Sequence, residues 1–366
     1  AIDVGIFALV SLWLLISIIK KRKVTVPLQK EIFLFAIIGA FSLFLNISSF
    51  STSQLFISFL YLFRWIYYAG VYFLMVSFDK KSKQSVIISL FISGFLVTLF
   101  GFLQYIYYPS LRNLYYAGWD EHLYRIFSTF LDPNFAGAFF MLFFILLFSY
   151  LLSAYKDKKR KEIYFFGISA VIVLFALFLT YSRGAYLSVT IALVVLLLKR
   201  GYAKWIVRIL GVVILFAVIS FFFFRRVSEG TNLLRQVSTV ERFHNAQNAF
   251  FIFSKNPLFG VGFDTYRYAQ RNTGILKDGA WEAGHGSAGA DSSLLFVLAT
   301  TGIIGFTLYL RLLQKMFLLS SHQDVISSAF LASLAGLLVD SFFINALFYP
   351  SIMVWMWTLL GIMENT

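Results

Sequence analysis

The feature that most constrains this chain is a series of long apolar runs. Val86–Tyr107 and Phe135–Leu152 contain no acidic or basic residue, and Trp205–Phe224 contains only Arg208. As a helix, a run of roughly 20 apolar residues crosses a hydrocarbon core of about 30 Å. The whole chain is 60% hydrophobic and 13% charged, well outside the range of soluble proteins. The runs therefore predict an all-α polytopic membrane protein.

Eleven stretches are apolar enough to be transmembrane helices. They lie at residues 2–19, 31–46, 55–78, 85–107, 133–155, 163–180, 185–198, 205–224, 293–312, 325–345 and 349–363. Because the chain begins without Met and inside an apolar run, we expect a twelfth, upstream helix in the full-length protein. The largest polar interval is 225–292. We therefore divide the chain into helices 1–8 (1–224), a lid loop (225–292) and helices 9–11 (293–366).

Lysine-rich loops follow alternate spans and set the predicted orientation. Such loops face the cytoplasm by the positive-inside rule, so residues 225–292 are expected on the extracytoplasmic side. Of the 31 Lys and Arg residues, 19 then lie on the inner side with 6 of the 17 acids. The net charge of +14 thus reflects membrane topology, and it implies no nucleic-acid partner.

The basic residues on the outer side and within the spans are almost all arginine. Arginine forms a planar, permanently charged fork that suits phosphate and diphosphate oxygens. Snorkelling at the membrane interface is an alternative for some of them, Arg225 and Arg226 above all. The ten arginines of this group are Arg64, Arg112, Arg125, Arg183, Arg225, Arg226, Arg235, Arg242, Arg267 and Arg271.

Two outer segments place arginines where an anion could bind. Leu179–Ala185 is a tight turn between two predicted spans, in which we expect Gly184 to permit the reversal and Arg183 to be either an interfacial anchor or an anion contact. Arg235, Ser238, Arg242 and Asn245 recur at helical spacing, which predicts an amphipathic helix with a polar face that is either solvated or functional. The Pro and Gly residues of 256–263 should end that helix in a turn.

Among the ionisable residues within predicted spans, two are candidates for a buried role. Arg64 lies deep in the third span, and Asp340 lies near the outer end of the tenth. Buried charges of this kind usually face an interior cavity and find a partner. The two could pair with each other, or Asp340 could pair with Arg183, in either a structural or a substrate-binding role.

Two residues at the end of the polar interval could act as a general base. Asp291 stands directly before the ninth span, and His285 lies six residues upstream between two glycines. Either could take a proton from a hydroxyl, although Asp291 could equally cap the following helix. The chain has no cysteine, and its four histidines show no metal-ligand spacing, so we predict neither a metal site nor a cofactor.

Five motifs in this order resemble those of the O-antigen ligase and O-antigen polymerase superfamily. They are Phe130–Ala136, Leu179–Ala185, Glu241-Arg242 with Asn256–Gly262, Asp291–Leu295 and Thr301–Gly305. The resemblance implies a metal-independent glycosyltransferase of the GT-C type in the bacterial cytoplasmic (inner) membrane. Such an enzyme moves a glycan from undecaprenyl diphosphate onto an acceptor hydroxyl on the extracytoplasmic side. By the resemblance, Arg183 and Arg242 hold the lipid diphosphate.

One motif departs from the ligase pattern and favours a polymerase. Ligases of the superfamily carry a histidine before the ninth span, where this chain has Asp291-Ser292. We therefore predict a polymerase of undecaprenyl-diphosphate-linked oligosaccharide, with Asp291 as the base. A ligase acting on lipid A-core or a protein acceptor is the alternative, and a lipid-linked sugar transporter is a third. Second-tier substrate contacts are Arg64, Arg125, Arg235, Arg267, Tyr181, Trp281, His285 and Asp340.

Overall fold

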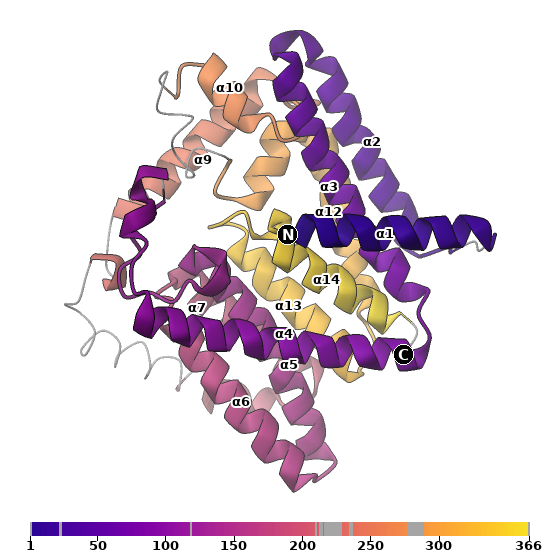
Figure 1. Ribbon diagram of the computed structural model, residues 1–366, viewed down its shortest axis with the longest axis vertical. Coiled ribbons are helices and arrows are strands. Elements are labelled where there is room, and N and C mark those ends of the chain that lie inside the picture. Colours follow the sequence, from indigo (N-terminus) through magenta and orange to yellow (C-terminus); the bar gives the residue numbers. More distant parts are fainter. Residues whose placement is uncertain are drawn as a thin grey trace. The chain divides into compact units, whose positions relative to one another are not determined.

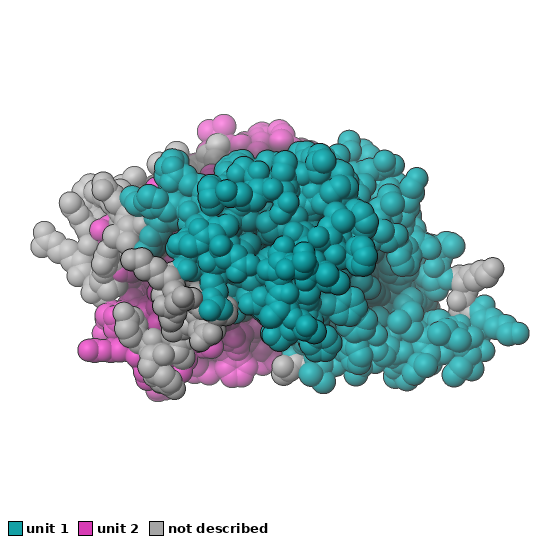
Figure 2. Space-filling view, turned by 90° about the horizontal axis from the view of Figure 1, so that it is seen from above, with its two compact units in different colours: residues 1–83, 240–319, 341–366 teal, residues 84–239, 320–340 magenta. Residues whose placement is uncertain are grey.

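The computed structural model describes residues 2–21, 24–117, 119–208, 211, 215, 229–233, 237–276 and 289–364 of the chain. All regular structure in these ranges is helical, as Figure 1 shows. The described helices divide into two compact units, which are coloured separately in Figure 2. Unit 1 comprises residues 1–83, 240–319 and 341–366, and unit 2 comprises residues 84–239 and 320–340.

Unit 1 is built from helices far apart in the sequence. They are α1 (Ile2–Ile19), α2 (Gln29–Leu45), α3 (Thr52–Val76), most of α9 (Val237–Lys255), α10 (Tyr266–Asn272), α12 (Ser293–Leu319) and α14 (Pro350–Met363), with the 3₁₀ turns η1 (Ile47–Ser49) and η7 (Ala346–Phe348). An aromatic core joins them. The Phe35 ring lies 4.9 Å from both Trp65 and Tyr309, and Tyr309 stacks on Phe348 at 5.6 Å. Edge-to-face and stacked ring pairs of this kind add to the energy of apolar burial.

Basic residues hold helix ends together in unit 1. The carboxylate of Glu31, at the start of α2, is buried and pairs with Lys315 of α12 at 2.7 Å and with Arg311 at 3.5 Å. Lys83 is also buried, and its Nζ donates to the carbonyl of Gly361 at 3.0 Å. A cation there satisfies carbonyls that the last turn of α14 leaves open.

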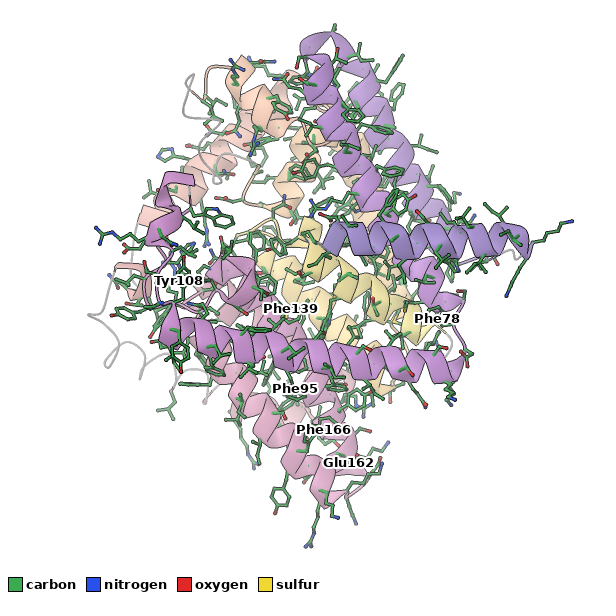
Figure 3. All side chains as sticks on the ribbon, in the orientation of Figure 1. Phe78, Phe95, Tyr108, Phe139, Glu162 and Phe166 are labelled. Carbon is green, nitrogen blue, oxygen red and sulfur yellow. The ribbon has the colours of Figure 1, made fainter. Side chains whose placement is uncertain are left out.

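Unit 2 is organised around α5 (Pro133–Lys156), which is buried along most of its length. Around it lie α4 (Lys80–Tyr107), α6 (Arg160–Phe178), α7 (Arg183–Lys199) and α13 (Val325–Asp340). The shorter 3₁₀ turns are η2 (Arg112–Ala117), η3 (Ser128–Phe130), η4 (Ala203–Trp205) and η5 (Glu229–Thr231). Phe95 and Phe166, labelled in Figure 3, belong to an aromatic cluster in which Phe95 lies 5.1 Å from Phe143. This packing fixes α4, α5 and α6 against one another.

Ten of the eleven predicted spans overlap a described helix, although the tenth, 325–345, is helical only to Asp340. Within the described residues, six helices are long and apolar enough to cross a membrane, namely α1, α3, α4, α5, α6 and α12, and α13 and α14 are shorter apolar helices. The predicted eighth span, 205–224, falls mostly outside the described residues. The all-helical membrane fold is confirmed, while the count of eleven, the orientation and the division at residues 224 and 292 stay predictions.

Candidate functional site

In unit 2, a tight turn presents Arg183 at the start of α7. The chain reverses between Phe178 and Arg183, and the residue with a left-handed backbone is Tyr181, at φ +50°. Gly184 was the residue predicted to make this reversal, and that prediction is wrong. Ser182 caps α7 by accepting from the Ala185 N–H at 3.4 Å, so Gly184 already lies within the helix.

Arg125 and Ile126 hold this turn through two hydrogen bonds. The Arg125 Nε donates to the Thr180 carbonyl at 2.8 Å, and the Ile126 N–H donates to the Leu179 carbonyl at 2.8 Å. Arg125 is 5% exposed. Its described contact therefore holds the turn, and a direct contact between Arg125 and substrate stays a prediction.

Two of the sequence motifs meet at the same turn. The Ser182 hydroxyl donates to Asn134 Oδ1 at 3.0 Å, and Asp132 caps α5 by accepting from the Asn134 N–H at 2.6 Å. Gly137 keeps α5 and α7 close, since an added Cβ would lie 2.6 Å from the Ala185 Cβ. The Phe130–Ala136 and Leu179–Ala185 motifs are thus one structural feature that fixes the position of Arg183.

The Arg183 side chain extends from this turn and is half-buried. Its Nη2 donates to Thr239 Oγ1 at 3.0 Å, and its Nη1 donates to the Leu233 carbonyl at 3.4 Å.

Tyr181 is only 4% exposed, so stacking of its ring on a sugar would require the turn to open. Burial raises the pKa of the Tyr181 hydroxyl to about 12. Asp340, also buried, is the last residue of α13.

In unit 1, the predicted amphipathic helix is present as α9, and it carries Arg242. The Arg242 guanidinium lies 5.7 Å from the centre of the Phe343 ring. Across the described residues it makes neither an ion pair nor a hydrogen bond. The charge of Arg242 is therefore stabilised by an aromatic ring, and its guanidinium can still bind an anion. Arg235, Trp281 and His285 lie outside the described residues.

The turn after α9 interlocks with a kink in α12. Gly260 and Gly302 both have positive φ, at +72° and +65°, and a Cβ on either would clash with backbone atoms of the other segment at 2.4 and 2.3 Å. Backbone hydrogen bonds run both ways. The Val261 N–H donates to Ala299 at 3.1 Å, and the Ile303 N–H donates to Pro257 at 2.9 Å. The predicted turn is confirmed, and it packs against the Thr301–Gly305 motif.

Asp291 lies just before α12 and is held through its backbone. Its N–H donates to Asn245 Oδ1 on α9 at 2.9 Å, and the next hydroxyl, of Ser292, donates to the Ser341 carbonyl at 2.8 Å. Capping of α12 by Asp291 was one expectation, and it is wrong. Ser292 is the capping residue, because its hydroxyl accepts from the Leu295 N–H at 3.3 Å. The Asp291 carboxylate is therefore not needed to start the helix.

Two buried polar groups accompany this segment. The Tyr266 side chain is fully buried, and its hydroxyl has no hydrogen-bond partner in the described part of the chain. Burial, aided by the charge of Asp291, raises the pKa of that hydroxyl above its usual range, so it stays a neutral donor. The Oδ1 of Asn345 is likewise buried without a partner in those residues. Both atoms are able to bind hydroxyl groups of a ligand.

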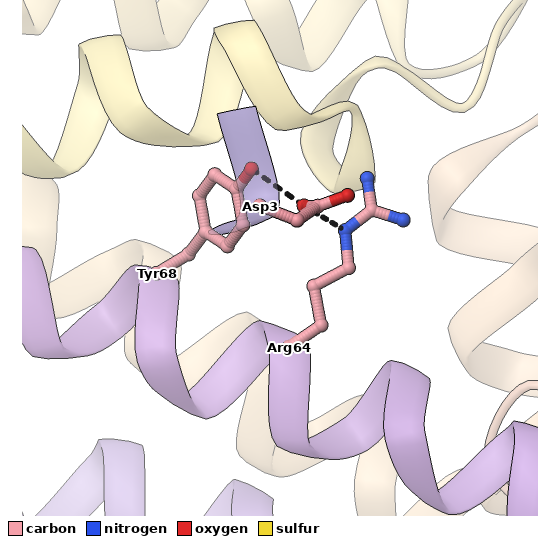
Figure 4. Close-up of polar contacts among 3 residues, drawn as sticks. All are labelled: Asp3, Arg64 and Tyr68. Carbon is pink, nitrogen blue, oxygen red and sulfur yellow. Dashed lines mark hydrogen bonds and ion pairs between the residues drawn. The ribbon is translucent and has the colours of Figure 1, made fainter. Parts of the chain in front are cut away.

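Arg64 pairs with a residue that the sequence did not indicate. Its Nε lies 2.9 Å from Asp3 Oδ1, which also accepts from the Tyr68 hydroxyl at 2.8 Å (Figure 4). No dashed line reaches either terminal nitrogen of Arg64 in Figure 4, and neither makes a hydrogen bond to any described residue. The Arg64 charge is thus only partly satisfied by the protein.

Asp264 and Arg267 lie near Arg64 in the same unit. Burial raises the pKa of the Asp264 carboxyl to about 8, although the charges of Arg64 and Arg267 act to lower it. The Nε of Arg267 is buried, and it too lacks a hydrogen-bond partner among the residues that the structure describes. Asp3, Asp264 and Tyr266 were missed in the sequence. The signal for the last two was an acid and a tyrosine directly after a Gly-rich turn.

The fold and these features define a class: a helical integral membrane protein with arginine-bearing turns and a carboxylate at the start of a kinked helix. Residues 168–310 match the model of the O-antigen ligase family, so the chain carries an O-antigen ligase family domain and the resemblance is confirmed. Comparison with curated proteins finds no match. The family indicates a membrane glycosyltransferase-like enzyme that acts on a lipid-linked glycan.

Proposed function

We propose that this protein polymerises oligosaccharide repeat units carried on undecaprenyl diphosphate, as in the making of an O-antigen or exopolysaccharide. The main support is the match to the O-antigen ligase family over residues 168–310. Asp291, Arg183 and Arg242 all fall inside that stretch. We further propose that it is a GT-C type enzyme of the bacterial cytoplasmic membrane, with its active site on the extracytoplasmic side.

In the proposed reaction, the Asp291 carboxylate takes the proton of an acceptor sugar hydroxyl. The oxygen attacks the anomeric carbon of the donor glycan, and the bond from that carbon to the diphosphate oxygen breaks. The electron pair leaves with undecaprenyl diphosphate, and the configuration at the anomeric carbon inverts. Asp291 then releases its proton to water, which returns the base to its starting state.

Arg183 and Arg242 are proposed to stabilise the charge that develops on the leaving diphosphate. Guanidinium groups that are already positioned near such a charge lower the barrier without a reorganisation cost. Arg242 fits this role because it has no ion-pair or hydrogen-bond partner in the described chain. Replacing either arginine by glutamine should lower the rate by about 100-fold. The proposal includes no metal, so a chelator should leave the rate unchanged.

A ligase is the second candidate, since the family match does not separate the two reactions. Both would use the same lipid-linked donor and differ in the acceptor hydroxyl. The polymerase is favoured by Asp291-Ser292, which stands where ligases of the superfamily carry a histidine. Arg235, Trp281, His285 and Asp340 remain proposed substrate contacts for either reaction.

The test uses purified protein in lipid nanodiscs with one lipid-linked repeat unit and products resolved by size. We expect a ladder of products from the wild type and none from Asp291→Asn. If this variant still forms a ladder, a residue other than Asp291 is the general base. If a single transfer occurs only after lipid A-core or a protein acceptor is added, the protein is a ligase.

The proposed orientation can be tested separately, because the chain has no cysteine. A cysteine at Lys255, the last residue of α9, should react with an impermeant maleimide added outside intact cells. A cysteine at Lys158, between α5 and α6, should react only after lysis. The opposite pattern would show that the membrane orientation is the reverse of the one proposed, which would rule out an extracytoplasmic active site.

A further inference from the structure

We propose that the groove between α1 and α3 in unit 1 binds a second lipid-linked glycan, the acceptor, through Arg64 and Arg267. This inference rests on the proposed polymerase, which must hold two such lipids: the donor and the repeat unit that receives the chain. The diphosphate of the acceptor would lie at the two arginines, and its polyprenyl chain would lie in the groove.

The groove has the apolar lining that a polyprenyl chain requires. Its volume is about 540 Å³, and its walls include Phe7 of α1 and Leu60, Phe63 and Tyr67 of α3. Phe7 stacks on Tyr67 at 4.6 Å, and Phe63 lies 4.6 Å from Tyr67, so the wall is a rigid aromatic surface. Phe7 and Leu60 remain 46% and 45% exposed. A hydrocarbon chain on this surface gains dispersion contacts along its length.

Arg64 lines the groove, and Arg267, which is not a lining residue, lies close enough to the Asp264 carboxyl to lower its pKa, as Arg64 does. Asp3 engages only the Nε of Arg64, which leaves both terminal nitrogens of that guanidinium without a hydrogen-bond partner in the described residues. Arg267, on α10, has no hydrogen bond or ion pair in the described part of the chain either. Two guanidinium groups with unused donors can bind the oxygens of a diphosphate in a bidentate manner.

The carboxyls nearby do not cancel this positive charge. Asp3 is shared between Arg64 and Tyr68, at 2.9 and 2.8 Å. Asp264 approaches both arginines, but burial favours its neutral form near pH 7. An incoming diphosphate would therefore meet two cations and one carboxylate. Anionic lipid would be attracted more strongly than neutral lipid.

The decisive experiment counts bound lipids without relying on activity. Purified full-length protein is titrated with undecaprenyl diphosphate, and complexes are counted by native mass spectrometry. We expect two bound molecules for the wild type, one for Arg64→Gln and one for Arg242→Gln. Arg271→Gln, an exposed neighbour on α10, should still bind two. One molecule on the wild type, or two on Arg64→Gln, would overturn the acceptor groove.

A second variant guards against a folding defect, because Arg64→Gln also breaks the pair with Asp3. Leu60→Trp leaves every charge in place and fills part of the groove. It should raise the KM for a labelled acceptor repeat at least tenfold, with the KM for the donor unchanged. An unchanged acceptor KM would exclude the groove as the acceptor site. Displacement of the second lipid by an equal amount of phosphatidylglycerol would show that the groove holds bulk lipid only.

These outcomes also separate the inference from the proposed function. If the wild type binds two lipid diphosphates but forms no ladder from any repeat unit, the polymerase reaction fails while the second site stands. If a ladder forms and Arg64→Gln and Leu60→Trp leave both the stoichiometry and the acceptor KM unchanged, the reaction stands and the groove is excluded.

Discussion

Two turns, at residues 179–183 in unit 2 and at residues 256–264 in unit 1, are anchored in opposite ways. In unit 2, the 179–183 turn is held largely by side chains: Arg125 donates to Thr180 at 2.8 Å, and Ser182 donates to Asn134 at 3.0 Å. In unit 1, the 256–264 turn is held largely by backbone hydrogen bonds to the kink of α12, two of which start from Val261 and Gly262 at 3.1 Å.

The difference decides which arginines are left for a ligand. Where side chains hold a turn, an arginine serves the fold, as Arg125 does by donating to the Thr180 carbonyl. Where glycines bring two backbones together, the polar main-chain groups satisfy one another, and Arg267 stays without a hydrogen-bond partner in the described residues. The buried fraction of an arginine does not by itself separate these two cases, whereas the hydrogen bonds of its side chain do.

The largest effect should follow from breaking the backbone anchor. Gly260→Ala forces a Cβ into a left-handed conformation and to within 2.4 Å of the Thr300 carbonyl carbon. The strain and the clash together should destabilise the protein by about 3 kcal/mol or more. The measurement is the thermal unfolding midpoint in nanodiscs.

Gly274→Ala is the matched control for that variant. Gly274 has nearly the same φ, +73°, but apart from its two chain neighbours no atom of a described residue lies within 4 Å of the point that an added Cβ would occupy. The control variant should lose only about 1 kcal/mol, the strain of the backbone alone. Equal losses in the two variants would mean that the contact with α12 does not exist.

A smaller effect should separate the two kinds of arginine. Arg125→Gln removes a charged hydrogen bond to a buried carbonyl, so it should destabilise the protein by about 2 kcal/mol. Arg267→Gln breaks no hydrogen bond in the described chain and removes a partly desolvated charge, so its stability should change by less than about 0.5 kcal/mol. Unfolding midpoints of the two variants test this order, and a larger loss for Arg267→Gln would refute the comparison.

Most of the fold could be predicted from the sequence because membrane helices follow from one property. A run of apolar residues long enough to cross the bilayer must be helical, since helices satisfy their own backbone groups. The helix α9 and the turn after it were predictable from helical spacing and from Pro257 and Gly260. The pairing of helices was not, because apolar surfaces of similar composition do not specify their neighbours.

Candidate site residues could be chosen from the sequence, but their contacts could not. The motifs pointed to Arg183 and Asp291, yet no local pattern could show that Ser182 bonds to Asn134 or that Ser292 takes the capping role. Arg64 could be marked as costly in a membrane, but its partner Asp3 lies 61 positions away in the chain. Long-range pairs of this kind depend on helix packing, which composition does not determine.

A pH dependence should set the turn of unit 1 apart. The Asp264 pKa is about 8 in the folded protein, against 3.8 for an ordinary carboxyl. Between these values the folded state holds a proton that the unfolded state lacks, so this group's contribution to stability falls as pH rises from about 4 to 8. Asp264→Asn should therefore raise the unfolding midpoint most at pH 8.5 and least at pH 5.

The comparison of wild type with Asp264→Asn isolates this group, because all others titrate in both proteins. Asp3, Arg64, Arg267 and the Ser58 hydroxyl, which donates to the Asp264 carbonyl, remain in place. A stability difference that stays constant from pH 5 to 8.5 would show that Asp264 titrates normally and is already ionised beside the two arginines.

The smallest effect concerns the side-chain anchor itself. Ser182 both caps α7 and donates to Asn134, so Ser182→Ala alone mixes two losses. A double-mutant cycle with Asn134→Ala removes the capping contribution, and the coupling that remains should be about 1 kcal/mol. A coupling near zero would mean that the two motifs meet without holding each other. Arg183 would then be positioned by Arg125 and the backbone bond of Ile126, and the contrast with unit 1 would narrow.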